Sequence, residues 1–313
     1  MTVSPALNPL VTAVATPPVA EAAAWRAAYD GRGGPMIDMA QAAPGYPPHE
    51  SILAGLAQSA AAPATYGAIS GDARLREVYA GHVAALYGAP VAADEIAITT
   101  GCNMAFVAVA MAVAQRGEAI LVPTPWYFNH DMTLSMLGVE PRPLPCRAQD
   151  GFLPDIAAAE ALIDARTRAI LLVTPNNPTG AVYPPSLIAE FARLCARRGL
   201  WLILDETYRD FLETQPAHGE LAGRERGRVM QLYSFSKAYC IPGHRLGAIL
   251  APRDVIPQIV KILDCLHICP PRAGQAMLPA AIEGLGGWRE ANRREIAARA
   301  DAFKQALANT GWR

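Results

Sequence analysis

Short apolar segments that alternate with helix-forming segments constrain the fold of this chain more than any other feature. The candidate strands are 95–100, 119–122, 168–173, 200–205, 229–233 and 246–250. The candidate helices around them include 72–86, 104–114 and 185–198. This alternation is typical of βαβ units and predicts a mostly parallel sheet with helices on both faces, which is a three-layer α/β/α arrangement.

Composition narrows the class of protein. The 313 residues are 52% hydrophobic, which is enough for a sizeable core, and 27 basic residues nearly balance 28 acidic ones. We therefore expect neither a nucleic-acid partner nor a membrane-surface partner. The apolar segment 104–114 is too short to span a bilayer, and prolines without a basic region at the N-terminus argue against a signal peptide. Six scattered cysteines without metal-binding spacing indicate reduced thiols and a cytoplasmic protein.

Lys237 is the first candidate for chemistry. It lies in Ser-Phe-Ser-Lys (234–237), a segment of small and apolar residues that solvates an ammonium group poorly. Poor solvation lowers the pKa of an amine and makes it available to form a Schiff base. Arg245 follows eight residues later in a glycine-rich turn and could hold a dianion such as a phosphate. An aldehyde cofactor that carries a phosphate would need both groups.

Two further motifs follow predicted strands. Asn-Asn-Pro-Thr-Gly (176–180) comes after the strand 168–173, and Asp-Glu-Thr-Tyr (205–208) ends the strand 200–205. Ligands of parallel α/β sheets bind outside the carboxyl ends of the strands. Gly101, Asn177, Asp205 and Lys237 all lie at or just after such ends, so we expect them to meet at one edge of the sheet.

Taken in this order, the motifs resemble those of the fold-type I pyridoxal-phosphate (PLP) enzymes, specifically the class I/II aminotransferases. The resemblance runs from about Asp38 to the C-terminus. It implies three regions: 1–45 as an N-terminal arm and part of a small domain, 46–285 as the large PLP-binding domain, and 286–313 as a connecting helix. It also implies that this helix leads into a smaller α+β domain, which we expect to be incomplete in this sequence.

The resemblance assigns the central roles. Lys237 would form the Schiff base with PLP and move the proton between the substrate Cα and C4′ of the cofactor. Asp205 would keep the pyridine nitrogen protonated, so that the ring accepts electrons. Tyr208 and Asn177 would hydrogen-bond the phenolic oxygen, although Asn-Pro sequences also simply favour turns.

The phosphate of PLP is expected at the start of the helix that follows Gly101, where backbone N–H groups and the helix dipole favour an anion. The residues expected around it are Gly101, Cys102, Asn103, Ser234, Ser236 and Arg245. By the same resemblance, Tyr66 would reach the phosphate of a neighbouring subunit, which implies a homodimer with shared active sites. A buried aromatic side chain is an equal alternative for Tyr66.

An aromatic segment supplies the remaining candidates. The family places a ring-stacking aromatic at Tyr127, and Trp126 competes with it by size. His130 would bond Asp205 from behind and fix its orientation, or it is simply a histidine of the core.

The resemblance implies an aminotransferase that moves an amino group between an amino acid and a 2-oxo acid. A β- or γ-elimination lyase or a PLP-dependent oxidase stays open, because no residue can be assigned to the substrate carboxylate. Ala42 also stands where relatives usually carry glycine. A transcriptional regulator is disfavoured, because residues 1–45 are too short and too poor in basic residues for a DNA-binding motif. The sequence does not identify the amino donor or the oxo-acid acceptor.

Overall fold

A seven-stranded sheet forms the centre of the protein in a computed structural model that describes residues 5–40, 43–59, 65–308 and 310–311. The strands are β1 (Ile96–Thr99), β2 (Ala119–Thr124), β3 (Glu140–Pro145), β4 (Thr167–Val173), β5 (Trp201–Asp205), β6 (Val229–Ser234) and β7 (Gly247–Leu250). Their order across the sheet is β1-β7-β6-β5-β4-β2-β3. Only β7 runs antiparallel to its neighbours, so the sheet is mostly parallel as predicted.

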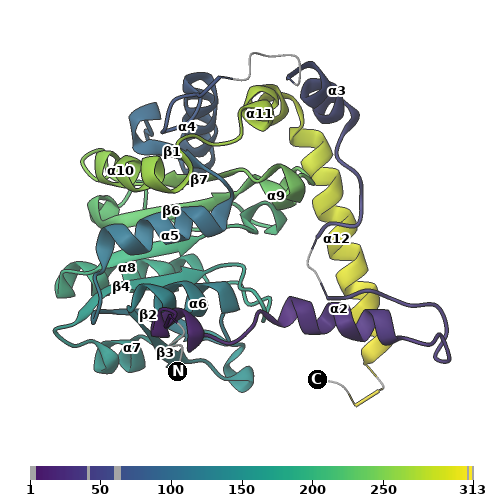
Figure 1. The fold of residues 1–313 in the computed structure, drawn as a ribbon, viewed down its shortest axis with the longest axis horizontal. Helices are drawn as coiled ribbons and strands as arrows, with labels where there is room; N and C mark the ends of the chain where they lie inside the picture. The colour runs from purple at the N-terminus through teal and green to yellow at the C-terminus, as the bar shows by residue number, and fades with distance from the viewer. Residues whose placement is uncertain (1–4, 41–42, 60–64, 309, 312–313) are drawn as a thin grey trace.

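Helices cover both faces of this sheet (Figure 1). One face carries α5 (Cys102–Val113), α6 (Phe128–Leu137) and α10 (Ile256–His267). The other carries α4 (Ala73–Tyr87), α7 (Ile156–Leu162), α8 (Pro185–Arg198) and α11 (Arg272–Gly284). In β4, Ala169 and Leu171 pack toward α5, whereas Ile170 and Leu172 pack toward α8. This alternation follows from the two-residue period of a strand and confirms the three-layer prediction.

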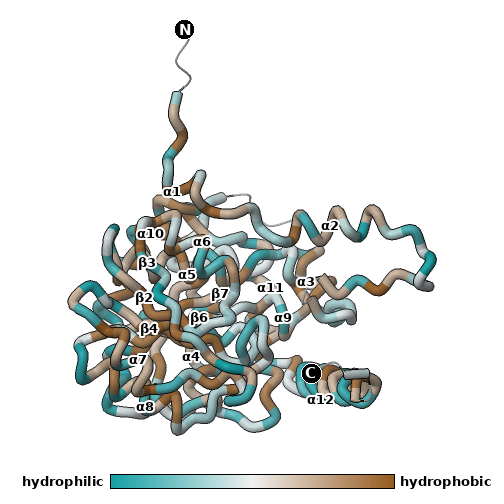
Figure 2. Tube along the Cα trace, turned by 90° about the horizontal axis from the view of Figure 1, so that it is seen from below, coloured by the Kyte–Doolittle hydropathy of each residue, from teal (hydrophilic) through white to brown (hydrophobic). Residues whose placement is uncertain are grey.

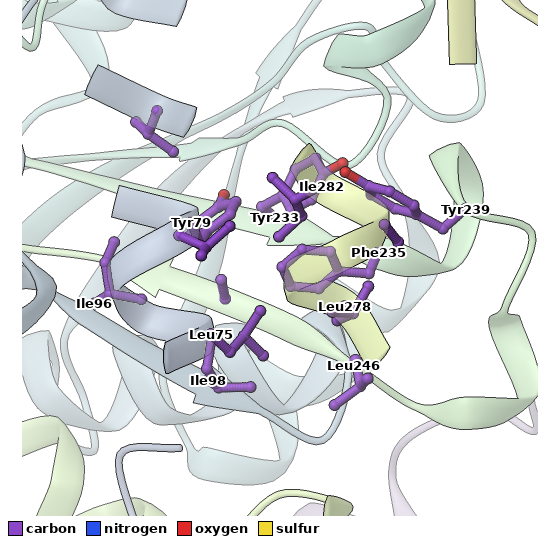
Figure 3. Close-up of a cluster of buried hydrophobic side chains, with 14 of the residues drawn as sticks. Leu75, Tyr79, Ile96, Ile98, Tyr233, Phe235, Tyr239, Leu246, Leu278 and Ile282 are labelled. Atoms are coloured by element: carbon purple, nitrogen blue, oxygen red, sulfur yellow. The ribbon is translucent and has the colours of Figure 1, made fainter. Parts of the chain in front are cut away.

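An aromatic cluster surrounds the end of β6 on the face of the sheet that α4 and α11 cover, and Figure 3 shows its side chains. Tyr233 stacks on Tyr79 of α4 with ring centres 5.6 Å apart, and Phe235 meets both rings edge-on. Phe235 begins the short helix α9 (Phe235–Ala238), which contains Lys237. The cluster therefore anchors the turn from β6 to α9 and with it the position of Lys237.

The remaining helices lie outside the three layers. Helix α3 (Glu50–Ser59) packs on α11, and α1 (Pro9–Thr12) packs on α6. Helices α2 (Pro18–Ala28) and α12 (Gly286–Leu307) overlap in Figure 1, but Figure 2 shows them apart on one side of the molecule. Helix α2 has no buried residue, and its Trp25 is 68% exposed. Within the described ranges, no helix has the length and apolar character needed to cross a membrane.

Candidate active site

A cavity of about 260 Å³ lies at the carboxyl ends of β4, β5 and β6. Strand alternation places Asp205 and Ser234 on the α5 face, because Ile203 and Leu232 also point there. The cavity is lined by Cys102, Asn103, Tyr127, Val173, Asn177, Asp205, Thr207, Tyr208, Ser234, Ser236, Lys237, Pro242 and Arg245. Ten residues of this lining were predicted from the sequence, from segments spread over half of the chain.

Lys237 enters the cavity from α9. Ser234 caps this helix, because its side-chain oxygen accepts a hydrogen bond from the backbone N–H of Ser236 at 3.3 Å. Burial lowers the pKa of the Lys237 amine below its ordinary value of 10.5, and the positive charge of Arg245 lowers it further. The Nζ atom lies 5.9 Å from the centre of the Tyr208 ring. The cavity therefore places an amine with a lowered pKa near the Tyr208 phenol.

Asp205 is a buried carboxylate with donors on both oxygens. His130 Nε2 lies 3.3 Å from Oδ2, and the backbone N–H of Thr207 donates to Oδ1 at 3.0 Å. The Cys102 thiol lies 3.8 Å from Oδ1. Burial alone would raise the pKa of Asp205, but the hydrogen bonds and charge of His130, together with Thr207, outweigh it and hold the pKa below 3.8. Asp205 is thus a fixed negative charge on the cavity wall.

Tyr208 and Asn177 also line the cavity. Their side chains are hydrogen-bonded, and burial followed by the charge of Asp205 raises the pKa of Tyr208 to about 12. The turn that carries Asn177 is held by its neighbour, because Asn176 Oδ1 accepts hydrogen bonds from both the backbone N–H and the hydroxyl of Thr179. Tyr208 consequently keeps its proton at neutral pH and can donate a hydrogen bond.

The residues expected to hold an anion, here called the anion cradle, lie together where α5 begins. Gly101 precedes the helix with φ 81° and ψ 168°, and a Cβ atom there would collide with the Arg245 guanidinium. Gly247 is required as well, because its Cβ would lie 2.8 Å from the backbone nitrogen of Cys102. The Ser236 hydroxyl is buried and has no hydrogen-bond partner among the described residues. Two glycines, a guanidinium, an unsatisfied hydroxyl and a helix N-terminus therefore converge.

The structure distinguishes the two aromatic candidates. Tyr127 lines the cavity, and its ring meets the His130 ring edge-on at 5.3 Å. Asn129 donates a hydrogen bond to the Tyr127 hydroxyl at 2.7 Å. Trp126 packs instead against the apolar core on the α5 face. Tyr127 is therefore the residue that can present a flat face to a ligand in this cavity.

Tyr66 is the one predicted residue that stands away from the cavity. Its side chain is 79% exposed, so the buried alternative is wrong. Gly101 and His130 do not line the cavity but contact residues that do, namely Arg245 and Asp205. Ala42 lies outside the described residues.

Sequence reasoning missed three lining residues and one contact. The Asp-Glu-Thr-Tyr motif suggests no role for Thr207, although a residue two positions after a strand-end aspartate often donates to it. Val173 and Pro242 carry no polar group that could have marked them. The contact between Cys102 and Asp205 joins residues 103 positions apart, and no local pattern encodes it.

Comparisons with known proteins agree with this geometry. The family described as "Aminotransferase class I and II" matches residues 28–313. The aromatic aminotransferase ISS1 of Arabidopsis thaliana is 29% identical over 70% of this chain and 56% of its own length. The arginine–pyruvate transaminase AruH of Pseudomonas aeruginosa is 29% identical over 83% of this chain and 65% of its own length. The chain thus spans a little over half to two thirds of the length of these relatives.

Comparison with solved structures agrees with this family match. The aspartate aminotransferase of Thermus thermophilus, solved with maleate, superimposes with a TM-score of 0.92 at 22% identity over 99% of this chain and 82% of that one. At this level of identity the likeness concerns the fold, and it establishes the fold-type I arrangement of PLP enzymes. Together with the family match over most of its length, it shows that this chain belongs to the class I and II aminotransferases.

Proposed function

We propose that this protein is a PLP-dependent aminotransferase that moves an amino group between an amino acid and a 2-oxo acid. One observation carries the proposal: a single cavity gathers a depressed-pKa lysine, a buried ionised aspartate and a protonated tyrosine. Family membership supports PLP as the cofactor. Relatives are named for different amino donors, aromatic amino acids and arginine among them, so their names do not choose a donor for this chain.

The residues present suit PLP. Its phosphate matches the anion cradle, where the buried Ser236 hydroxyl lacks a partner and Gly101 leaves room for the Arg245 guanidinium. The backbone N–H groups of Cys102 and Asn103, at the start of α5, and the Ser234 hydroxyl would complete this anion site. Tyr127 would pack on the flat face of the ring.

Bound PLP would supply an aldehyde for the amino group and a ring that accepts electrons released at the substrate Cα. Lys237 would provide the amine that holds the cofactor, and it would then take the proton from Cα and return it at C4′. Asp205, held by His130, would keep a proton on the ring nitrogen. Tyr208, supported by Asn177, would donate a hydrogen bond to the phenolic oxygen of PLP.

We further propose a homodimer in which Tyr66 of one subunit reaches the phosphate of the other. The backbone around Tyr66 is fixed, because Arg272 donates to the carbonyl and hydroxyl oxygens of Thr65 and the Gly67 N–H donates to Cys269 Sγ. A large aromatic side chain that is 79% exposed on a fixed backbone is suited to contact a second subunit. The oligomeric state of the purified protein, compared with that of a Tyr66→Asp variant, tests this.

The three regions inferred from the sequence, 1–45, 46–285 and 286–313, are retained as the proposed domain organisation. A cytoplasmic location is likewise proposed, and the six free cysteines support it.

The absorption spectrum of the PLP-loaded protein tests the activity. Addition of a reactive amino acid should convert the band of lysine-linked PLP to that of pyridoxamine phosphate, and a 2-oxo acid should restore it. Release of a keto acid without formation of pyridoxamine phosphate would contradict transamination and indicate elimination or oxidation.

A further inference from the structure

A second and larger cavity adjoins the candidate active site. Its volume is about 790 Å³, and it shares Asn177, Tyr208 and Lys237 with the smaller cavity. A molecule whose amino group meets Lys237 could therefore extend its side chain into this space. The chemistry of the cavity wall should determine which side chains are accepted.

Apolar groups from two sides form much of this wall. The large domain contributes Val182, Phe211 and Leu212, and α12 contributes Ile296 and Ala297. The α12 residues recur at helical spacing, so a single face of that helix looks toward the strand ends. An apolar substrate side chain placed here would be removed from water and packed against apolar side chains.

The cations on the α12 side are already matched by carboxylates. Arg293 donates two hydrogen bonds to Glu290, both at 2.8 Å, and the charge of Glu213 also acts on Arg293. Lys304 lies 3.5 Å from Asp301. Arg293 and Lys304 are the cations that α12 contributes to the described part of this wall, and each lies within ion-pair distance of a carboxylate. A substrate with a second carboxylate would bring that group near the carboxylates of Glu213 and Asp301, and the α12 cations already pair with carboxylates. Repulsion and unpaired burial would therefore weaken its binding.

We propose that the side-chain site accepts apolar amino acids, such as leucine and phenylalanine, in preference to the dicarboxylic amino acids aspartate and glutamate. This inference rests on the proposed function, because it assumes that the amino group reacts at Lys237. Each methylene that becomes buried improves binding by about fourfold. Leucine, with three more carbons than alanine, should therefore bind roughly fiftyfold more tightly than alanine if its side chain is fully buried.

Binding of unreactive carboxylic acids tests the proposal without turnover. The probes are 3-phenylpropanoate and glutarate, titrated into the PLP-loaded protein and followed by the PLP absorption band. At least a tenfold lower Kd for 3-phenylpropanoate supports an apolar site. An equal or lower Kd for glutarate overturns it.

Variants of α12 locate the effect. Ile296→Lys adds an unmatched cation to the wall, so it should weaken 3-phenylpropanoate and strengthen glutarate, each by about tenfold. Ala300→Lys makes the same change at an exposed wall position, where the fold tolerates it more readily. The matched control is Ala298→Lys, which lies on the same helix but does not line the cavity and should leave both Kd values unchanged. An equal change in Ala298→Lys and Ala300→Lys would refute the assignment of this wall.

Failure of the apolar-site proposal can be distinguished from failure of the proposed function. A protein that takes up no PLP contradicts the proposed function, whereas one that transaminates aspartate as readily as leucine contradicts only the apolar site. Calorimetric titration of the two carboxylates into the PLP-free protein tests the cavity wall in either case. A preference for 3-phenylpropanoate there supports the apolar site, and its absence overturns it.

Discussion

His130 Nε2 lies 3.3 Å from Oδ2 of Asp205, and both side chains are almost completely buried. The His130 ring is itself confined, because Phe106 packs against it with ring centres 4.4 Å apart and Tyr127 meets it edge-on. The histidine cannot turn away without disturbing these rings. Asp205 is therefore held ionised and in one orientation toward the cavity.

Replacement of Asp205 by asparagine should leave the fold and PLP binding intact but lower kcat by about 100-fold or more, because the fixed negative charge is lost. Steady-state kinetics and the PLP absorption band measure the two effects. Asp131→Asn is the control, since this carboxylate lies one position from His130 but outside the cavity. Unchanged turnover in Asp205→Asn would refute the role proposed for this carboxylate.

Replacement of Lys237 by alanine should abolish the link to PLP that borohydride makes permanent. In the unaltered protein, capture of PLP should persist well below pH 10.5, because the pKa of the buried amine is lowered. As the pH falls through that lowered pKa, the amine takes up a proton and capture should decline. Lys261→Ala, on the surface of α10, should capture PLP like the parent. A borohydride-stable adduct in Lys237→Ala, located by mass spectrometry, would assign the link to another residue.

A pair of glycine substitutions separates backbone strain from loss of the anion cradle. Gly101 and Gly117 have similar φ values, 81° and 87°, but a Cβ at Gly117 meets nothing within 4 Å. Alanine at either position should cost about 1–2 kcal/mol of stability, since positive φ is unfavourable for a residue with Cβ. Only Gly101→Ala should also weaken PLP binding, by displacing the Arg245 guanidinium. Equilibrium dialysis against PLP measures this, and equal affinities of the two variants would contradict the cradle.

The sequence predicts the elements that position the site better than those that flank it. Helix α8 has the predicted bounds, because Pro185 begins it and Gly199 ends it in the left-handed conformation. Strands β4 and β5 are buried on both faces, so each appears in the sequence as a continuous apolar run.

Strand β3 escaped prediction because proline occupies alternate positions in it, at 141, 143 and 145. This strand lies at the edge of the sheet, and the backbone N–H of Glu140 donates toward β2. Backbone groups alternate between the two sides of a strand, so the prolines at 141, 143 and 145 face the open edge of the sheet. A missing N–H costs no hydrogen bond there, and it hinders pairing with a further strand. Proline normally argues against a strand, and only the position at the sheet edge reverses that argument.

In the site as well, local sequence patterns predict some residues, whereas contacts between distant parts of the chain cannot be predicted from them. Motifs at strand ends identified Lys237, Asp205 and Asn177, because the position of each follows from its own strand. Glu206 received no role, although it is fully buried beside Asp205. It points to the opposite face, where its partners come from distant parts of the chain. Tyr87, for example, is 119 residues away and donates to both Glu206 oxygens at 2.7 Å.

The cluster around Glu206 supports the last prediction, which concerns stability. His218 Nε2 lies 3.0 Å from Glu206 Oε1, and the Arg209 guanidinium lies 3.5 Å from Oε2 and 4.1 Å from the centre of the Tyr233 ring. Burial tends to raise the pKa of Glu206, but the charges of His218 and Arg209 outweigh it and lower the pKa below 4.5. Glu206 is therefore a buried anion whose stability depends on its partners.

Arg209→Met should lower the free energy of unfolding by about 3–5 kcal/mol, because it removes one of the two charges that offset the buried Glu206 carboxylate. The double variant Glu206→Gln/Arg209→Met should be more stable than Arg209→Met alone, since it also removes the buried charge that Arg209 offset. Arg26→Met, which breaks an exposed pair with Asp38, should cost no more than about 1 kcal/mol. Urea unfolding at neutral pH measures all three.

The pH dependence gives an independent check on the same cluster. Because the folded pKa of Glu206 is lowered, its contribution to stability is present above pH 4.5 and is lost as the pH falls through the folded value. The stability difference between the parent and Glu206→Gln should therefore shrink in acid. A difference that stays constant down to the acid unfolding transition would mean that packing, rather than the charge of Glu206, holds this cluster together.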